Sequence, residues 1–542
     1  MAGMNTNAEV FGAIAIEEKA LLISAQGEEE EATWKTLPHK TQLLLLALCR
    51  LSAPLSNACL VPYLYFLIKS ILSDPTHPTA PQQISRLTGL LVAAYPIGQM
   101  LTSILCGQLS DRYGRKPVIL FGLTISVVAN SAFGFSRTIG MLVFWRVLAG
   151  MANGMLGVMR TMTAEIVRDP KHQTRAFLAP PLIFNSGRVI ALVIGGCLAD
   201  PVDNLPSLFG PHGFFNFARN PLGVRWALQY PYALPALFNG AVLAACLVSA
   251  TLWLRESVPK KVNGQDFGLA LGKYVSNFIK RTVLRRHASG YTLVQTEEDN
   301  TTISFSSEPT HRPLFRDIWT SRLLKTLLAF ALLPLHTSTF LHIFPVFLSM
   351  PTEPNPSPSI FQFAGGLGLA SPTVGLYLAI FGIAGILLQL FIFPQFQKRL
   401  GKLGVFRLAN LIFPLAYIFA PYLALLSGHD CAKWVVMAVV LFTQVMARTM
   451  AIPSSIILLT DAAPHRSVLG TVHGAGSTLS ALFSACGPAI GGLLLAKGIE
   501  IGSVGLVWWS WLCTVSVVAL GWSFMLDRGC EEKESCKSSI DL

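Results

Sequence analysis

Long apolar segments separated by polar connections make up most of the chain between residues 42 and 526. Each segment approaches the length of about 20 residues that a helix needs to cross a bilayer. The apolar runs are continuous and do not alternate with a period of two residues, which favours helices over the strands of a β-barrel. The pattern predicts twelve transmembrane helices, near residues 42–68, 88–108, 117–135, 139–163, 176–198, 231–254, 322–348, 372–394, 405–427, 433–457, 468–496 and 504–526.

Polar stretches divide this pattern into two groups of six helices. We predict a cytoplasmic tail over residues 1–40, a six-helix bundle over 41–254, a second bundle over 321–526 and a cytoplasmic tail over 527–542. The intervening residues 255–320 carry basic clusters followed by a Ser/Thr- and Glu-rich stretch, and their low apolar content predicts a largely disordered cytoplasmic linker. The expected fold is therefore an all-α integral membrane protein of two pseudo-symmetric bundles.

Composition and charge agree with a membrane protein. Hydrophobic residues form 52% of the chain and charged residues only 13%, whereas soluble domains carry about 25% charged residues. The net charge of +12 does not indicate a nucleic-acid partner, because most cations lie in connections predicted to be cytoplasmic, where they orient the helices. The ten cysteines form no C-x-x-C pair, and no nucleotide-binding or hydrolase motif occurs. We expect no metal, no cofactor and no enzymatic activity.

A dense charged turn joins the second and third predicted helices. It contains Gly107, Asp111, Arg112, Gly114, Arg115 and Lys116. Short basic connections are retained in the cytoplasm, so this turn predicts the orientation of the whole chain. Its cations offer partners to carboxylates at cytoplasmic helix ends, and Glu165 at the end of the fourth helix is the first candidate. Gly107 is expected to allow close packing of the second helix.

The second half repeats these features in weaker form. A basic turn over 397–402 follows the eighth helix, and Asp461 ends the tenth helix as Glu165 ends the fourth. Gly150 and Gly154 form a G-x-x-x-G face for helix packing, and Gly487-Pro488 is expected to act similarly in the eleventh helix.

The charged turn resembles the G-x-L-x-D-R-x-G-R-K signature of the major facilitator superfamily. This resemblance implies a transporter with twelve helices in two bundles and a substrate site near the midplane, where the halves meet. It also implies that the cluster around the turn locks the outward-facing state and breaks on inward opening.

A narrower resemblance rests on Arg146 and Gly150 in the fourth helix, Pro62-Tyr63 and the segment 232–235. With these features the chain is similar to fungal relatives of the plant zinc-induced facilitator-like transporters, a drug/proton antiporter-like group. The resemblance implies efflux or vacuolar loading of a small organic solute or secondary metabolite, coupled to protons.

Two departures from that group affect the coupling. Ala53 occupies a position where those relatives usually carry an acidic residue, and the fifth helix lacks the central Gly-Pro of the antiporter pattern. The first departure removes a proton carrier, and the second weakens the assignment of antiport.

The ionisable residues predicted to lie within the helices are cations. Arg50, Arg146, Arg188 and Arg448 fall inside predicted spans, whereas no Asp or Glu lies near the middle of any span. Charged residues are costly in this environment and usually mark function. Because Arg binds carboxylate and phosphate in a fork geometry, this inventory predicts an anionic solute such as an organic acid. For Arg50 a structural role is equally expected.

Three histidines are the candidates for proton coupling: His336, His342 and His473. His336 also joins the candidate cavity residues. A lone histidine within a span is as often a hydrogen-bonded packing residue, so that alternative remains open for each.

The leading hypothesis is a monomeric transporter whose partners are a small-molecule substrate, the lipid bilayer and protons. A uniporter, an anion exchanger or a non-transporting membrane receptor remains an alternative. The expected location is the plasma or vacuolar membrane, and Glu17-x-x-x-Leu21-Leu22 resembles an acidic dileucine sorting signal toward the latter.

Overall fold

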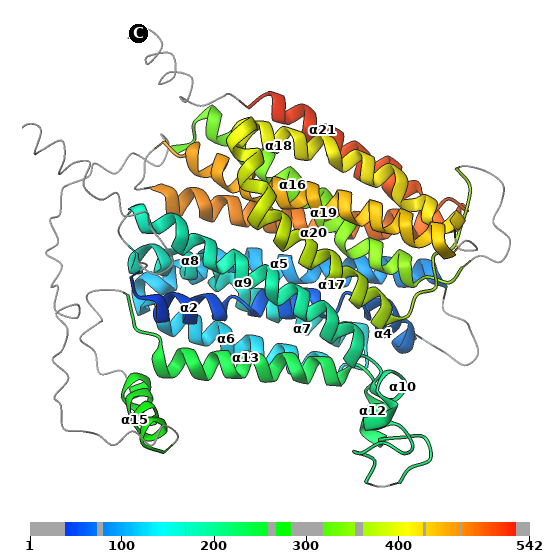
Figure 1. Ribbon diagram of the computed structural model, residues 1–542, viewed down its shortest axis with the longest axis horizontal. Coiled ribbons are helices and arrows are strands. Elements are labelled where there is room, and N and C mark those ends of the chain that lie inside the picture. The colour runs from blue at the N-terminus through cyan, green and yellow to red at the C-terminus, as the bar shows by residue number, and fades with distance from the viewer. Residues whose placement is uncertain are drawn as a thin grey trace, which may run out of the picture.

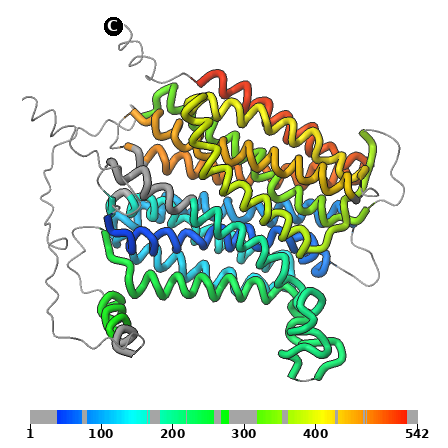
Figure 2. Tube along the Cα trace, viewed as in Figure 1, coloured from blue at the N-terminus to red at the C-terminus, as the bar shows by residue number. Residues whose placement is uncertain are grey.

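The computed structural model contains helices, turns and loops but no strand in the residues it describes. These are residues 38–72, 80–167, 170–217, 219–257, 267–282, 318–352, 361–426, 430–464 and 468–526. The helices form two bundles side by side, the first half of the chain in one and the second half in the other (Figures 1 and 2). The dileucine segment and the C-terminal tail lie outside the described residues.

The first bundle follows the predicted order, and its first span is broken twice. Its elements are α2 (Lys40–Cys49), α3 (Ser52–Ala58), α4 (Leu64–Leu72), α5 (Pro81–Tyr113), α6 (Arg115–Phe133), α7 (Ile139–Ala152), the 3₁₀ turn η1 (Asn153–Met155), α8 (Leu156–Ile166), α9 (Pro170–Leu198), α10 (Pro201–Asn204), α11 (Pro206–Phe209), α12 (Arg225–Gln229) and α13 (Ala233–Trp253).

The second bundle contains long helices with two π-helical segments. Its elements are α16 (Ser321–Ser349), α17 (Ser371–Leu387), the π-helix η4 (Leu388–Ile392), α18 (Phe393–Phe419), the 3₁₀ segment η5 (Ala420–Leu426), α19 (Asp430–Asp461), α20 (Leu469–Glu500), the π-helix η7 (Val507–Cys513) and α21 (Thr514–Phe524).

Nine helical stretches in the described residues are long and apolar enough to cross a membrane. One of them, Ser371–Leu426, contains two passes, because Gly401 has a φ of +69° and breaks the helix at the basic turn. The broken segment α2–α4 and the shorter apolar part of α9, Leu182–Leu198, complete an arrangement consistent with the twelve predicted spans.

Small residues bring helix backbones together within the bundles, as predicted. A Cβ added to Gly150 would collide with the backbone oxygen of Tyr95, and one added to Gly154 would lie 2.5 Å from Thr102 Oγ1. A Cβ added to Gly487 would lie 2.2 Å from the backbone oxygen of Leu335 in α16. Close approach of this kind maximises van der Waals contact between helices in lipid.

The prediction for Gly107 is wrong in this conformation, because a Cβ added there would meet nothing within 4 Å. Gly474, near the start of α20, also faces open space. Both residues lie toward the end of the bundles that carries the basic turns, which we assign to the cytoplasm.

The two bundles contact each other tightly toward the opposite end, away from the basic turns. A Cβ added to Gly89 of α5 would lie 2.5 Å from the backbone oxygen of Pro488 and 3.1 Å from the Cα of Gly492 in α20. Likewise, a Cβ added to Gly375 of α17 would lie 2.6 Å from the backbone oxygen of Leu192 in α9. No side chain fits between the backbones at either contact.

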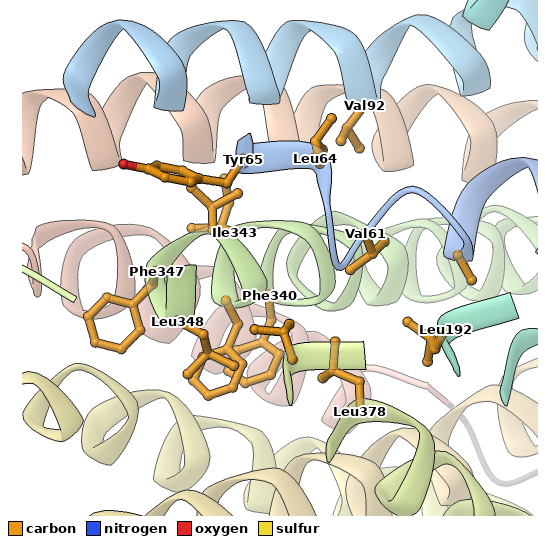
Figure 3. Close-up of a cluster of buried hydrophobic side chains, with 14 of the residues drawn as sticks. Val61, Leu64, Tyr65, Val92, Leu192, Phe340, Ile343, Phe347, Leu348 and Leu378 are labelled. Atoms are coloured by element: carbon orange, nitrogen blue, oxygen red, sulfur yellow. The ribbon is translucent and has the colours of Figure 1, made fainter. Parts of the chain in front are cut away.

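A hydrophobic cluster reinforces this closure. It includes residues of both bundles, among them Val61, Leu64, Val92, Leu192, Phe340, Ile343, Phe347 and Leu378 (Figure 3). At the outer surface an ion pair joins Arg86 of α5 to Glu500 of α20, with 2.6 Å between Nη2 and Oε1. The side of the interface that lies away from the basic turns is therefore closed.

The linker contains a helix that the composition did not predict. Residues Phe267–Thr282 form α15, whereas the whole of 255–320 was expected to be largely disordered. The helix contacts the end of α13, where Trp253 Nε1 donates to Ser276 Oγ at 3.0 Å. This helix was not expected, and the largely disordered character of the linker otherwise stays a prediction.

Candidate functional site

Two arginines from opposite bundles lie within electrostatic reach of each other. Arg188 lies on α9 and Arg448 on α19, and both side chains are partly exposed. The positive charge of Arg448 acts on Arg188. In the described residues every Asp and Glu lies at a helix end or in a connection, so no carboxylate of the span interiors compensates these charges. An anion is the natural counterion for such a pair.

His342 of α16 lies among the same charges. Its ring is within electrostatic reach of Arg146, Arg188 and Arg448, which come from both bundles. Its Nδ1 lies 2.8 Å from the backbone oxygen of Ser338. A carbonyl oxygen can only accept, so Nδ1 carries a hydrogen and Nε2 remains available for a ligand or a second proton. We call Arg146, Arg188 and Arg448 the arginine cluster. Of the three predicted histidines, His342 is the one that lies within its electrostatic reach.

Arg146 contributes its charge to this cluster but is bound within the first bundle. It is 3% exposed, donates to the backbone oxygen of Ser56 at 2.6 Å and to Asn57 Oδ1 at 2.9 Å, and lies over the ring of Tyr95. The cavity beside it has a volume of about 20 Å³, which is room for one water molecule. Arg146 therefore has a structural role in this conformation, and its place in a substrate cavity stays a prediction.

His336 does not line an open space in this conformation. It is fully buried, its Nδ1 lies 2.8 Å from the hydroxyl of Tyr417, and its ring packs edge-on against Phe413. Both its predicted roles, in the cavity and in proton coupling, require water or substrate to reach it. The packing alternative fits His336 better, because aromatic side chains enclose it.

A second group of cations lies nearer the cytoplasm. The guanidinium of Arg50 lies 5.1 Å from the ring centre of Phe184. The like charge of Arg160 lies near enough to repel it. Arg160 Nη1 donates across the interface to Ser477 Oγ of α20 at 2.9 Å. His473 lies within electrostatic reach of Arg160, and its Nε2 lies 3.2 Å from Thr460 Oγ1.

Arg160 is the residue of this group that sequence reasoning missed. It lies close to the predicted end of the fourth span, where a cation is expected to extend into the headgroup region. The available signal was its spacing of fourteen residues from Arg146, which places both on nearly the same side of one helix.

The predicted partner of the charged turn is present. Arg115 Nη2 lies 3.1 Å from Glu165 Oε1, and Arg115 Nη1 also pairs with Asp111. Ser257 Oγ donates to Glu165 Oε2 at 2.5 Å. These groups all belong to the first bundle or to the segment after α13. In this conformation the contacts of Arg115 therefore stabilise that bundle. Its role in locking the outward-facing state stays a prediction.

The second half contains the counterpart of this ion pair. Lys402, in the basic turn after η4, lies with its Nζ 2.9 Å from Asp461 Oδ2 at the end of α19. The matching positions of Arg115–Glu165 and Lys402–Asp461 support the internal repeat read from the sequence.

Glu256 is a further residue of the cytoplasmic network that the sequence did not single out. Its two carboxylate oxygens accept from the backbone N–H groups of Arg115 at 2.9 Å and Lys116 at 3.0 Å, the first residues of α6. A carboxylate at a helix N-terminus satisfies unpaired donors and the helix dipole. Gly114 has a φ of +107°, and a Cβ there would lie 2.5 Å from Glu256 Oε2. The signal was an acidic residue directly after the sixth span.

The remaining cations of the turn occupy different surroundings. Lys116 Nζ donates to the backbone oxygen of Thr251 at 3.1 Å, which ties α6 to α13. Arg112 is exposed and lies over the ring of its neighbour Tyr113.

We predict that Glu256→Ala lowers the free energy of unfolding by about 0.5–2 kcal/mol, the range measured for loss of a helix cap. Glu256→Gln should cost less, because its amide oxygen still accepts one of the two hydrogen bonds. Thermal unfolding of the purified variants measures both effects. Equal stability of Glu256→Ala and the wild type would show that the cap contributes nothing.

Comparison with known proteins gives a consistent set of likenesses. Residues 46–353 match the family model described as Major Facilitator Superfamily. The chain is 31% identical over 535 residues to the major facilitator superfamily multidrug transporter mfsB of Aspergillus fumigatus, covering 90% of this chain and 84% of that protein. It is 26% identical to ZINC INDUCED FACILITATOR 1 of Arabidopsis thaliana over 82% of each chain. Among solved structures, a D-xylose–proton symporter matches 90% of this chain and 98% of its own with a TM-score of 0.59 at 13% identity.

Proposed function

The chain belongs to the major facilitator superfamily, and we propose that this transporter carries a small organic anion through the interface between its two bundles. The proposal rests chiefly on the approach of Arg188 and Arg448 from opposite bundles, without a carboxylate from the described span interiors. Two like charges close together repel each other. A bound carboxylate, sulfonate or phosphate would offset this repulsion and draw the two bundles toward the ligand.

Alternating access is supported by the unequal ends of the interface. Backbone contacts at Gly89 and Gly375 and the hydrophobic cluster close the extracellular side. Toward the cytoplasm Gly107 and Gly474 face open space, and polar contacts such as Arg160 with Ser477 join the bundles. Polar side-chain contacts can exchange their partners for water at low cost. We therefore infer a conformation directed toward the cytoplasm, from which efflux or vacuolar loading would begin.

His342 is the proposed proton-coupling residue. It shares the surroundings of the arginine cluster, whereas His336 is enclosed by aromatic side chains. A neutral imidazole whose Nδ1 hydrogen is held by Ser338 keeps Nε2 free to take a proton. Multidrug transport in the fungal relative's name agrees with export of a secondary metabolite.

The charge of the substrate is tested directly by a ligand panel. Purified protein is heated with organic acids and with their neutral amides or esters, and the shift of the melting temperature is recorded. Ligands that bind the native state raise that temperature. We expect stabilisation by at least one class of acid and none by its amide. Stabilisation by neutral compounds alone would overturn the anion proposal.

A further inference from the structure

The linker helix α15 has three distinct faces. Gly272 is buried against the backbone of Leu252 in α13, and Ser276 bonds Trp253, so these positions form the side that faces the first bundle. Phe267, Leu271 and Tyr274 lie on another side, spaced four and three residues apart as a helical stripe requires. Their exposed fractions are 82%, 44% and 71%.

Exposure of this kind is unusual for a helix in water. Three large apolar or aromatic side chains form one continuous stripe, whereas single exposed apolar residues are ordinary. Lys273 is exposed on another side of the helix. The sequence of Phe267–Thr282 also contains Lys280 and Arg281 but no Asp or Glu. An apolar stripe beside a purely basic one is typical of helices that lie in the interface of an anionic membrane.

The position of α15 places this stripe at the membrane surface. Trp253, the last residue of α13, marks the end of a membrane-spanning helix, and tryptophan favours the headgroup level. Its hydrogen bond to Ser276 holds α15 at that level. Figure 1 shows α15 running across the direction of the spans, beyond α13 and away from the second bundle. The sides of α15 that do not contact α13 would therefore face the lipid around the first bundle.

We propose that α15 lies in the cytoplasmic leaflet as an interfacial helix, with its Phe267–Leu271–Tyr274 stripe among the lipid chains and its cations binding anionic headgroups. The stripe contributes burial of apolar surface, and each cation near the surface adds electrostatic attraction. Because α15 is hydrogen-bonded to the end of α13, the lipid composition of this leaflet would act on α13. Glu256 and its contacts with α6 follow directly after that helix. The inference does not depend on the identity of the transported solute.

The test is hydrogen–deuterium exchange of the full-length protein in nanodiscs of phosphatidylcholine alone or mixed with phosphatidylserine. Exchange of the amides of 267–282 should slow by about tenfold or more in the anionic discs, as expected for three cations near a charged surface. Amides in the middle of α13 should exchange equally in both.

Two variants separate the two contributions. Phe267→Ser/Tyr274→Ser should speed exchange of α15 in both lipids, whereas Lys273→Gln should reduce only the difference between the lipids. Asn277→Gln, an exposed polar replacement on the same helix, serves as the matched control and should change neither. Identical exchange in the two lipids, together with no effect of the serine variant, would overturn the proposal.

Discussion

Arg448→Gln and Arg188→Gln are each expected to lower transport of the anionic substrate by about 10- to 100-fold. Glutamine has nearly the length of arginine but lacks the charge and the two-pronged donor group, and a hydrogen bond to a charged group contributes about 1.5–3 kcal/mol. Both arginines come from the interface, one from each bundle, so each variant leaves a single guanidinium to hold the ligand.

Uptake into proteoliposomes of the acid identified by thermal stabilisation measures this effect. Arg137→Gln is the matched control, because it removes the same charge at an exposed position outside the interface, where Arg137 donates to the hydroxyl of Tyr230. Transport by both interface variants at the wild-type rate would contradict the proposed anion site. A loss equally large in Arg137→Gln would attribute the effect to net charge.

Gly492→Leu is expected to abolish transport while leaving a folded protein. Gly492 lies in the closed contact between the bundles away from the basic turns, where a Cβ would already be 2.7 Å from the backbone oxygen of Ser85. A leucine there forces α5 and α20 apart at this end, so the extracellular side cannot close. Overpacking of this kind typically costs about 1–3 kcal/mol, and separation of the bundles relieves it.

The conformational part of this prediction is read from a cysteine placed at Ser371, which is buried at the other extracellular contact. Its labelling by a membrane-impermeant maleimide, measured over the background of the native cysteines, should rise in Gly492→Leu. Gly521→Leu is the control, since a Cβ at Gly521 meets nothing within 4 Å. Size-exclusion chromatography establishes that the variant is folded. Normal transport by folded Gly492→Leu would show that closure at this contact is not required.

Much of the architecture could be predicted from hydrophobic patterning, because membrane-spanning helices satisfy their own backbone and need long apolar runs. The Arg115–Glu165 pair was predictable for a related reason, since charges at helix ends seek partners on the same membrane side. The helix α15 was not, because a short amphipathic segment in a charged linker gains its order from contacts with α13 that composition does not reveal.

The site residues divide along the same line. That Arg188 and Arg448 lie deep in their spans follows from the sequence, but their approach to each other depends on how the bundles meet. The partners of Arg146 are Ser56 and Asn57 in the last turn of α3, just before the second break in the first span, which only the fold reveals. Gly107 was expected to be packed, yet a Cβ added there would meet nothing within 4 Å, and sequence alone cannot tell which face of a helix meets a neighbour.

A cryo-electron microscopy structure in nanodiscs with the most stabilising acid tests the central claim most directly. We predict ligand density between the guanidinium groups of Arg188 and Arg448, within hydrogen-bonding distance of both and next to His342. Density bound elsewhere, with those two guanidinium groups still unoccupied, would contradict the claim that they hold the transported anion.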